Sequence, residues 1–256
     1  AFTDIWVKDE KIIYELNVTG TLNVLELAGK LGINDVVFSS TAGVLGPSTG
    51  SEIAEDTVRQ TDYFLEYERT KAIAEQMAIE FAGKGMNVRI VSPTRVYGPG
   101  VLNPSNSVTR MIASYRAGKW RIIPGNGNSI GNYVYIGDVV EGHIKAMENG
   151  KAGEKYILGG ENISYNEFFS VIGNVSGREH FLIKVPLPLI YLLADTAMIA
   201  NKIFGAKPFI TKALVRKFKS NWQTSSLKAI RELGYSITPF PEGVRQTIEW
   251  IRKNKS

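Results

Sequence analysis

The chain of 256 residues contains no cysteine and only two histidines, and these shortages exclude several kinds of site. A chain without cysteine has no disulfide framework, no thiol nucleophile and no thiolate-bound metal. The two histidines, His143 and His180, lie too far apart in the sequence to form a local zinc motif. His143 falls among Val139, Ile144 and Met147 in an expected helix, so we interpret it as a structural residue. We therefore expect no metal site.

The chain also lacks a strong excess of charge of either sign. It has 30 basic and 25 acidic residues, which gives a formal net charge of +5 at pH 7. This excess is too small, and too dispersed over most of the chain, to indicate a nucleic-acid partner, but it is compatible with an anionic cofactor or a lipid surface. The apolar fraction of 44% is sufficient for a proper buried core.

The longest apolar stretch, from Val185 to Phe204, is not a clean membrane span. It has about the length of a span, but five residues interrupt it: Pro186, Pro188, Asp195, Asn201 and Lys202. We therefore expect a buried or surface-lying amphipathic helix. Basic residues in and after this stretch leave open a weak association with an anionic membrane surface: Lys202, Lys207, Lys212, Arg216, Lys217 and Lys219.

Short apolar runs alternate with helical patterns through the first 160 residues. Helices are predicted over 9–31, 63–82 and 107–117, and over 138–148 with Asp138 as the expected N-cap. Strands are predicted over 35–40, 87–91, 121–123, 133–136 and 155–158. Because each crossover is long enough for a helix, this order predicts an α/β fold with a parallel sheet and helices on its faces. The ligand site of such a sheet lies beyond the carboxyl ends of its strands.

After Gly160 the pattern becomes mainly helical. Ser164 and Glu167 fit a capping box that opens a helix to about Val175, and further helices are predicted over 187–204, 211–219, 225–233 and 241–253. We divide the chain into a first domain over 1–160 and a smaller lobe over 161–256, with contributions to the lobe from about 95–135. Gly125-Asn126-Gly127 has the wrong spacing for a dinucleotide fingerprint, which favours a turn before a strand.

Tyr67 and Lys71 carry the strongest indication of chemistry. Four residues apart on a predicted helix, they share one face. An ammonium one turn from a phenol favours the phenolate and lowers the phenol's pKa from its ordinary value of about 10. Ser39, Ser40 and Thr41 end an apolar run a short way upstream, so the Thr41 hydroxyl can hold a substrate oxygen beside Tyr67. The pattern predicts proton transfer to or from an alcohol or a carbonyl.

Five segments in order resemble the extended short-chain dehydrogenase/reductases, also called the nucleoside-sugar epimerase/dehydratase family. They are Asn17–Leu25, Val37–Gly46, the pair Tyr67 and Lys71, Arg89–Gly100, and Tyr133–Val139. The resemblance runs over residues 1 to about 160 and more weakly to the C-terminus. The turn Gly159–Asn162 and the long apolar helix of the C-terminal lobe are similar to the dihydroflavonol reductase-like and hydroxysteroid dehydrogenase-like group, including the hopanoid-associated sugar epimerase type.

The resemblance implies a Rossmann-type doubly wound parallel sheet that binds NAD or NADP. It implies that Tyr67 donates and accepts the proton, that Thr41 orients the substrate oxygen, and that Lys71 lowers the pKa of Tyr67 and binds the nicotinamide ribose. The other implied cofactor-binding residues are Thr3, Asn17, Ser39, Ser40, Pro93 and Thr94, and the residues implied to face the substrate are Arg95 and Val96.

These roles lead us to expect an oxidoreductase that acts on a small, hydrophobic alcohol or carbonyl. The apolar C-terminal lobe is the reason for expecting a hydrophobic substrate. Two alternatives stay open. One is an epimerase or dehydratase that acts on a nucleotide sugar and keeps NAD tightly bound, and the other is a non-catalytic binding module.

The resemblance also shows what is missing. The family begins with a strand, a glycine-rich turn and a helix that have no counterpart here, and Ala1-Phe2 resembles the tail of its fourth strand. We therefore expect an N-terminally truncated fragment that lacks the residue choosing NAD or NADP and has a bare sheet edge. In the family, helices that start near Asp9 and Tyr63 pair between subunits, which implies a homodimer. We expect a cytoplasmic protein.

Overall fold

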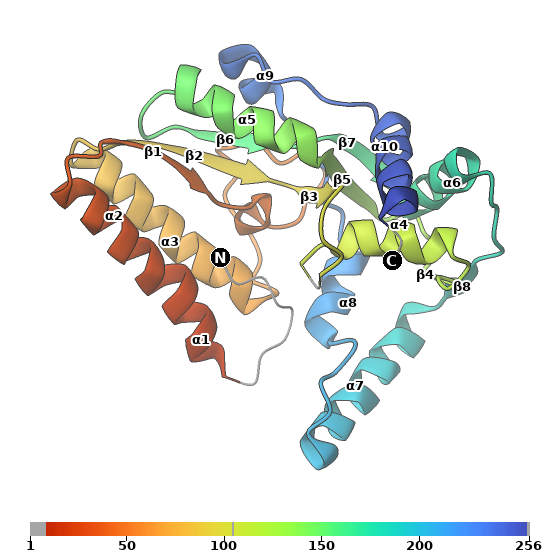
Figure 1. Cartoon of the computed structure of the whole chain (residues 1–256). Coiled ribbons are helices and arrows are strands. Elements are labelled where there is room, and N and C mark those ends of the chain that lie inside the picture. The colour runs from red at the N-terminus through yellow and green to blue at the C-terminus, as the bar shows by residue number, and fades with distance from the viewer. Residues whose placement is uncertain (1–8, 104, 255–256) are drawn as a thin grey trace.

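A parallel sheet of three strands forms the centre of the first half of the chain (Figure 1). The computed structural model describes residues 9–103 and 105–254. The sheet has the order β1 (Asp35–Ser39), β2 (Asn87–Pro93) and β6 (Lys155–Leu158). Phe38 pairs with Ile90, and Val91 pairs with Tyr156. The parallel pairing and the strand positions confirm the α/β prediction.

Helices cover both faces of this sheet, as Figure 1 shows. The helix α3 (Glu66–Gly83) packs Ala74 and Ala78 against Ile90 on one face. The helix α5 (Ile136–Asn149) packs Val139 against Val91 on the other face. Because successive side chains of a strand point to opposite faces, neighbouring residues of β2 serve two different cores. This double burial explains why the strand reads as a continuous apolar run.

The N-terminal helix is interrupted, although the sequence predicts one helix over 9–31. It consists of α1 (Glu10–Tyr14), a π-helical turn η1 (Glu15–Thr19) and α2 (Gly20–Lys30). The Thr21 hydroxyl donates to the carbonyl oxygen of Asn17 at 2.7 Å, which is the oxygen that the Thr21 amide would reach in a regular α-helix. Side-chain hydrogen bonds of this kind compete with the helical ladder, and no periodicity in the apolar residues reveals them.

Two smaller sheets follow. In one, β3 (Arg95–Tyr97) is parallel to β5 (Ile130–Tyr135), and β5 is antiparallel to β7 (Glu161–Ser164). In the other, β4 (Ile122–Pro124) is parallel to β8 (Ile183–Val185). The sequence does not predict β3, β7 or β8, because these short strands contain polar residues, do not stand out as apolar runs and are held by partners distant in sequence. Gly125 and Gly127 form the predicted turn before a strand, with φ of 64° and 80°.

A second core joins these sheets to three helices. It lies among β3, β5, α4 (Ser107–Arg116), α6 (Tyr165–Ser176) and α10 (Phe240–Lys253). At its centre the ring of Phe168 lies 4.8 Å from the ring of Tyr133 and 5.3 Å from the ring of Phe240. The predicted capping box is confirmed, since Ser164 and Glu167 exchange hydrogen bonds at the start of α6. The proposed division into domains stays a prediction.

Two helix starts differ from the sequence predictions. The helix α3 begins at Glu66 instead of Tyr63, because the preceding residues form a loop around Arg59. The helix α5 begins at Ile136, so Asp138 is not its N-cap but lies in its first turn. The Asp138 carboxylate accepts hydrogen bonds from the backbone amide and the hydroxyl of Thr238, at 2.8 and 2.6 Å. Asp138 therefore ties α5 to the segment before α10.

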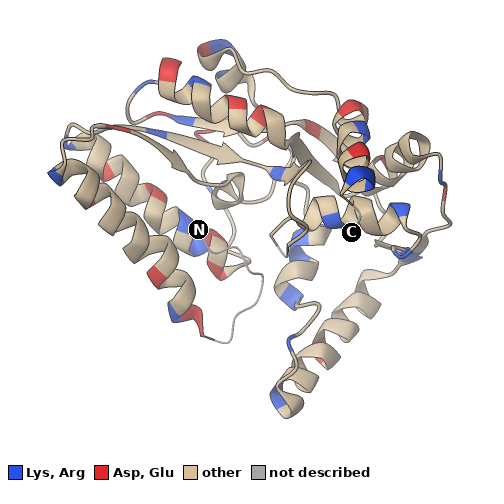
Figure 2. Ribbon diagram, in the orientation of Figure 1, with Lys and Arg blue, Asp and Glu red and all other residues tan. Residues whose placement is uncertain are grey.

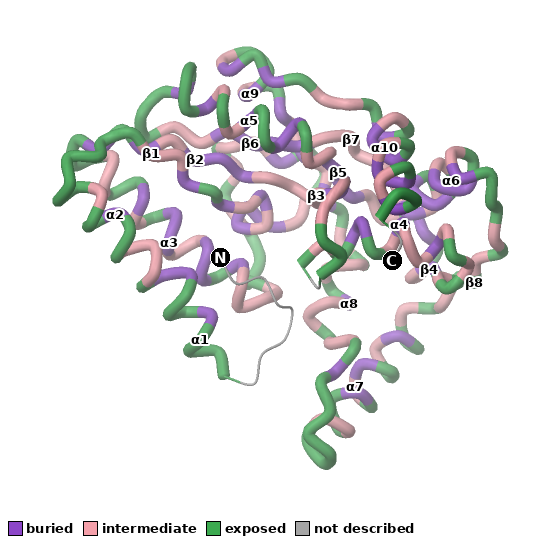
Figure 3. The backbone as a smooth tube through the Cα atoms, in the orientation of Figure 1, coloured by how far each residue is buried: buried purple, intermediate pink, exposed green. Residues whose placement is uncertain are grey.

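The remaining helices are α7 (Leu187–Phe204), α8 (Lys212–Lys219) and α9 (Leu227–Leu233). Figure 1 shows α9 near α5, whereas α7 projects away from the rest of the molecule. Among the described helices, α7 is the one that is long and apolar enough to cross a bilayer, and only 17% of that stretch is buried. Figure 3 shows exposed segments along much of α7.

Candidate functional site

The predicted site begins where β1 ends. Thr41 follows Ser39 and Ser40 and caps a short 3-10 turn, η2 (Ala42–Leu45). Its hydroxyl oxygen accepts a hydrogen bond from the Gly43 amide at 3.2 Å. Because Thr41 is extended and its side chain is fixed by this cap, its hydroxyl has a defined direction at the carboxyl end of the sheet.

Tyr67 lies in the first turn of α3 and meets this hydroxyl. Its phenolic group is hydrogen-bonded to the Thr41 side chain, so the two residues expected to share a substrate oxygen lie in contact. Burial raises the pKa of Tyr67 above its ordinary value of 10.0; the hydrogen bond from Thr41 works in the opposite direction, and the nearby Glu68 carboxylate adds to the rise. The phenol is therefore held protonated over the physiological range.

Lys71 is on the same face of α3, one turn further on, and is only 3% exposed. Its ammonium donates to the Ser39 carbonyl oxygen at 2.6 Å and lies 4.3 Å from the centre of the Phe38 ring. Burial lowers the pKa of Lys71 from 10.5 to about 8, although Glu75 opposes the shift. The expectation that Lys71 lowers the pKa of Tyr67 is wrong for this arrangement, because burial of the phenol dominates and the ammonium is turned toward the end of β1.

The burial of Lys71 predicts that stability depends on pH. The folded pKa of about 8 lies below the unfolded value of 10.5, so between these values the unfolded chain binds more protons and the free energy of unfolding rises with pH. The penalty for burying the ammonium is complete below pH 8 and is relieved above it. We expect Lys71→Met to remove this rise, which urea unfolding on either side of pH 8 measures without added nucleotide. The exposed Lys84 supplies the control, Lys84→Met. An unchanged pH dependence in Lys71→Met would contradict the expectation.

The two serines before Thr41 point in different directions. The Ser40 hydroxyl donates to the Glu75 carboxylate, which also pairs with Lys155 on β6. The Ser39 hydroxyl lies 2.7 Å from Nε2 of His143, while Nδ1 of His143 lies 2.7 Å from the carbonyl oxygen of Val139. Since a carbonyl can only accept, Nδ1 carries the hydrogen and Nε2 accepts from Ser39. His143 therefore holds the Ser39 side chain and has a structural role. The part of Ser39 that contacts Lys71 is the Ser39 backbone carbonyl.

Asn17 is brought to the site by the π-helical turn. It is 1% exposed, and its amide nitrogen donates to the Thr70 hydroxyl at 3.1 Å, one residue before Lys71. Single π-helical turns inside helices occur frequently at functional sites. Thr3, which the resemblance implied near the cofactor, lies outside the described residues.

Pro93 is the last residue of β2 and Thr94 follows it, so both lie at the carboxyl end of the strand as predicted. The Thr94 hydroxyl donates to Oδ1 of Asn132 at 2.7 Å, and the buried Asn132 also donates to the Gly160 carbonyl oxygen at 2.9 Å. This amide therefore joins the central sheet to the β3–β5–β7 sheet. Ser92, the residue before Pro93, has a buried hydroxyl with no hydrogen-bond partner among the described residues.

Arg95 and Val96 are placed differently from the substrate-facing positions that the resemblance implied. The Arg95 guanidinium donates to the hydroxyls of Tyr133 and Tyr165 at 3.1 and 3.3 Å, and lies over both rings. Val96 is partly buried against the α5 side of the core. A three-residue strand inside the second sheet therefore takes these side chains into packing, which sequence spacing alone cannot show.

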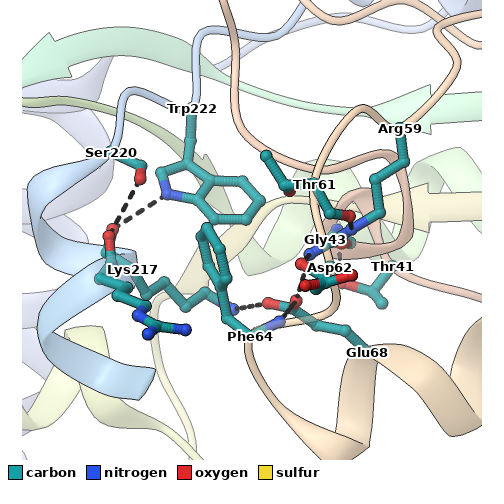
Figure 4. A network of polar contacts seen from close by, with 11 residues as sticks. Thr41, Gly43, Arg59, Thr61, Asp62, Phe64, Glu68, Lys217, Ser220 and Trp222 are labelled. Atoms are coloured by element: carbon teal, nitrogen blue, oxygen red, sulfur yellow. Dashed lines mark hydrogen bonds and ion pairs between the residues drawn. The ribbon is translucent and has the colours of Figure 1, made fainter. Parts of the chain in front are cut away.

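Sequence reasoning missed a buried ionic network next to Tyr67 (Figure 4). Glu68 is fully buried, and its carboxylate accepts from Arg59 at 3.0 Å, from the Phe64 amide at 3.1 Å and from Lys217 of α8 at 2.9 Å. Arg59 also donates to the Gly43 carbonyl oxygen at 2.6 Å. This network, which we call the Glu68 network, ties the loop after Thr41, the start of α3 and helix α8 together.

A cavity of about 810 Å³ opens beside the Glu68 network, between the loop before α3 and helices α7 and α8. Its lining residues combine basic, polar and aromatic side chains: Arg59, Gln60, Thr61, Asp62, Phe64, Tyr191, Arg216, Lys219 and Ser220. The cavity shares Arg59 and Phe64 with the Glu68 network. No local sequence signal marks it, because its walls come from segments separated by more than 120 residues in the chain.

The donors at the end of β1 fit the ribose and nicotinamide half of NAD or NADP. Ser39 is the one hydrogen-bond acceptor of the Lys71 ammonium among the described residues, so two of its N–H groups remain for ligand hydroxyls. Tyr67 and Thr41 add two hydroxyls on the same side, and the unpaired Ser92 hydroxyl adds another polar group near the end of β2. The chemistry of this donor set matches a sugar and a carboxamide.

Comparison with curated proteins finds relatives that span most of the chain. A putative dihydroflavonol 4-reductase of Synechocystis sp. is 27% identical over 262 residues, covering 99% of this chain and 75% of the relative. The 3beta-hydroxysteroid-dehydrogenase/decarboxylase isoform 2 of Arabidopsis thaliana is 28% identical over 272 residues, covering 97% of this chain and 47% of the relative. The chain thus spans about half to three quarters of the length of these relatives.

Comparison with solved structures also finds proteins that share the fold over nearly the whole chain. The crystal structure of gox2253 has a TM-score of 0.81 and 30% identity, covering 99% of this chain and 76% of that one. A UDP-glucose 4-epimerase of Thermus thermophilus, in complex with NAD, shares the fold with a TM-score of 0.76 at 21% identity over 100% of this chain and 76% of that one. Residues 3–159 match the NAD dependent epimerase/dehydratase family. This chain therefore belongs to the NAD dependent epimerase/dehydratase family, whose members are NAD(P)-dependent enzymes of the short-chain dehydrogenase type.

Proposed function

We propose that the protein is an oxidoreductase that reduces a carbonyl, or oxidises an alcohol, of a small hydrophobic molecule with NAD or NADP. The observation that carries the proposal is the contact between the hydroxyls of Tyr67 and Thr41, with the Lys71 ammonium one turn away on α3. Family relatives named for dihydroflavonol reduction and for hydroxysteroid dehydrogenation support a hydrophobic substrate.

Each residue of the site has a definite role in this proposal. Tyr67, kept protonated by its burial, gives its proton to the oxygen of a carbonyl substrate and takes it back in the reverse direction. Thr41 holds that oxygen beside the phenol. Lys71 binds the nicotinamide ribose, with Asn17, Ser39, Ser40, Pro93 and Thr94 around the nicotinamide half of the cofactor. The bound nucleotide supplies or accepts the hydride.

The direct test is turnover of reduced nicotinamide nucleotide with a panel of hydrophobic carbonyl compounds, such as steroid and flavonoid ketones. We expect NADH or NADPH to be consumed in proportion to the alcohol formed. Nucleotide binding is measured separately by titration calorimetry. A chain that binds neither nucleotide would contradict the proposal and leave a non-catalytic binding module.

One feature favours a sugar epimerase or dehydratase as the second candidate. The cavity beside the Glu68 network has Arg216 and Lys219 in its wall, and such cations suit the phosphates of a nucleotide sugar. An epimerase returns the hydride to its substrate, so it converts a nucleotide sugar without net consumption of NADH. Measurement of product and nucleotide in the same reaction separates the two candidates.

We also propose a homodimer through the N-terminal helices and α3. The helices α1, η1 and α2 expose the apolar residues Ile12, Leu16, Val24 and Leu27. Packing against a second copy would bury these side chains, and a symmetric pair of helices is a common dimer interface. We expect sedimentation velocity to show a dimer in the wild-type protein and a monomer in Leu16→Asp. A wild-type protein that stays monomeric at high concentration would contradict this assignment.

A further inference from the structure

The helix α7 has an outer face that no described part of the chain covers. Its inner face packs Ile190 and Ala194 against Val215 of α8. The outer face consists of residues at helical spacing with high exposed fractions: Leu189 (48%), Leu192 (59%), Leu193 (43%), Ile199 (57%) and Ile203 (66%). A contiguous stripe of exposed apolar side chains marks a surface that interacts with a protein, a ligand or a membrane.

The net positive charge, which we expected to be dispersed over most of the chain, is concentrated around this same helix. The segment 187–220 contains six basic residues and one acidic residue, whereas the whole chain has 30 and 25. The rest of the chain is therefore formally neutral, and the entire excess of five positive charges lies in the segment that carries α7 and α8. Figure 2 shows this as blue bands on α8 and at the free end of α7, with little red between them.

Several of these cations are available to a partner. Lys217 is taken up by Glu68, and Lys212 pairs with Asp195 at 2.7 Å. Lys202, Arg216 and Lys219 have no carboxylate partner among the described residues. Arg216 and Lys219 line the cavity beside the Glu68 network, and Lys202 is in the last turn of α7. An apolar face combined with unpaired cations favours a surface that is both apolar and anionic.

We propose that the outer face of α7 binds the surface of an anionic lipid bilayer. The helix lies in the interface, with its outer leucines and isoleucines among the acyl chains and the neighbouring basic residues on the lipid headgroups. Self-association is disfavoured as the explanation, since two copies packed through α7 would bring two segments of net charge +5 together. The exposed Phe204 and Phe209 near the free end of the helix extend the apolar surface.

The test is flotation of the full chain with lipid vesicles. We expect binding to vesicles of phosphatidylcholine mixed with phosphatidylserine, weaker binding to phosphatidylcholine alone, and weakening as salt is raised, because headgroup attraction is screened. Each basic residue near an anionic surface contributes to binding, so replacing three of them weakens affinity by roughly tenfold or more. The charge variant is Lys202→Gln with Arg216→Gln and Lys219→Gln. Its matched control replaces three basic residues on other elements: Lys30, Lys84 and Lys119.

The apolar part of the surface is tested by Ile199→Asp with Ile203→Asp. Both side chains are exposed, so the change leaves the folded core intact, and thermal unfolding checks this. The matched control is Val140→Asp with Ile144→Asp on α5, two exposed apolar residues with the same spacing. We expect the α7 pair to lose vesicle binding by at least roughly tenfold and the α5 pair to keep it.

Three results would overturn the proposal. One is a wild-type chain that floats with neither vesicle, and another is equal vesicle binding by the α7 and α5 variants. The third is self-association that disappears in the Ile199→Asp and Ile203→Asp variant while vesicle binding is absent throughout, which would show a second copy on this face.

Discussion

Tyr67→Phe is expected to lower kcat by about a thousandfold, because general acid–base catalysis by a positioned side chain contributes about 10² to 10⁴. The substitution removes one hydroxyl and leaves the ring, so the packing at the start of α3 is kept. Tyr67 contacts Thr41 but is not part of the Glu68 network, so that network stays intact. Nicotinamide binding should change little, since Lys71 keeps its contact with the Ser39 carbonyl. Steady-state kinetics with the best substrate of the carbonyl panel measures the loss, and calorimetry measures nucleotide affinity.

Tyr14→Phe is the matched control for this experiment. Tyr14 is an exposed tyrosine on α1, and losing its hydroxyl should leave kcat at the wild-type value. A Tyr67→Phe enzyme with more than half of the wild-type kcat would show that another group moves the proton. If nucleotide binding and kcat fell together, the role of Tyr67 would be in holding the cofactor and not in proton transfer.

The central sheet and its helices could be predicted because their signals are local. The strand β2 is an apolar run buried on both faces, and α3 carries its small apolar residues Ala74 and Ala78 on one side. The carboxyl ends of parallel strands meet at one edge, which places Thr41 and Tyr67 together without knowledge of any contact. The sequence thus predicts one shared crevice for the two residues, whereas the hydrogen bond between their side chains is seen only in the structure.

The electrostatics of the site could not be predicted in the same way. The sequence places an ammonium and a phenol on one helix face and so predicts that Lys71 lowers the pKa of Tyr67, but a pKa also depends on how much water each group loses. The structure buries both groups, which raises the pKa of the phenol and lowers that of the ammonium. The burial of Tyr67 and Lys71 depends on the loop before α3 and on the packing around the site. The four-residue spacing of the two residues in the sequence contains no information about either.

Long-range pairing accounts for the other differences. The family resemblance implies that Arg95 faces substrate, yet its place in β3 beside β5 turns it toward Tyr133 and Tyr165. The partners of Glu68 are Arg59 in a loop and Lys217, which lies 149 residues further along the chain. A glutamate between Tyr67 and Lys71 on a helix reads as an ordinary surface residue until its tertiary neighbours are known.

Glu68→Ala is expected to lower the free energy of unfolding by about 3–5 kcal/mol, which is the usual cost of removing one partner from a buried ion pair. The substitution leaves Arg59 and Lys217 without their carboxylate and the Phe64 amide without its acceptor. Arg59 is itself 9% exposed in its side chain, so its charge cannot turn freely to water. Urea unfolding followed by tryptophan fluorescence measures the change, because Trp222 lies beside Lys217 and reports on this region.

A graded series distinguishes the Glu68 network from an ordinary ion pair. Lys217→Met removes only the link to α8 and leaves Glu68 paired with Arg59, so it should cost less than Glu68→Ala. Glu66→Ala breaks the more exposed pair with Arg69 three residues away on the same helix, and should cost under about 1 kcal/mol. If Glu68→Ala cost no more than Glu66→Ala, the buried carboxylate would not hold these segments together. If the series holds, the start of α3, and with it Tyr67, is positioned from the C-terminal half of the chain through a single carboxylate.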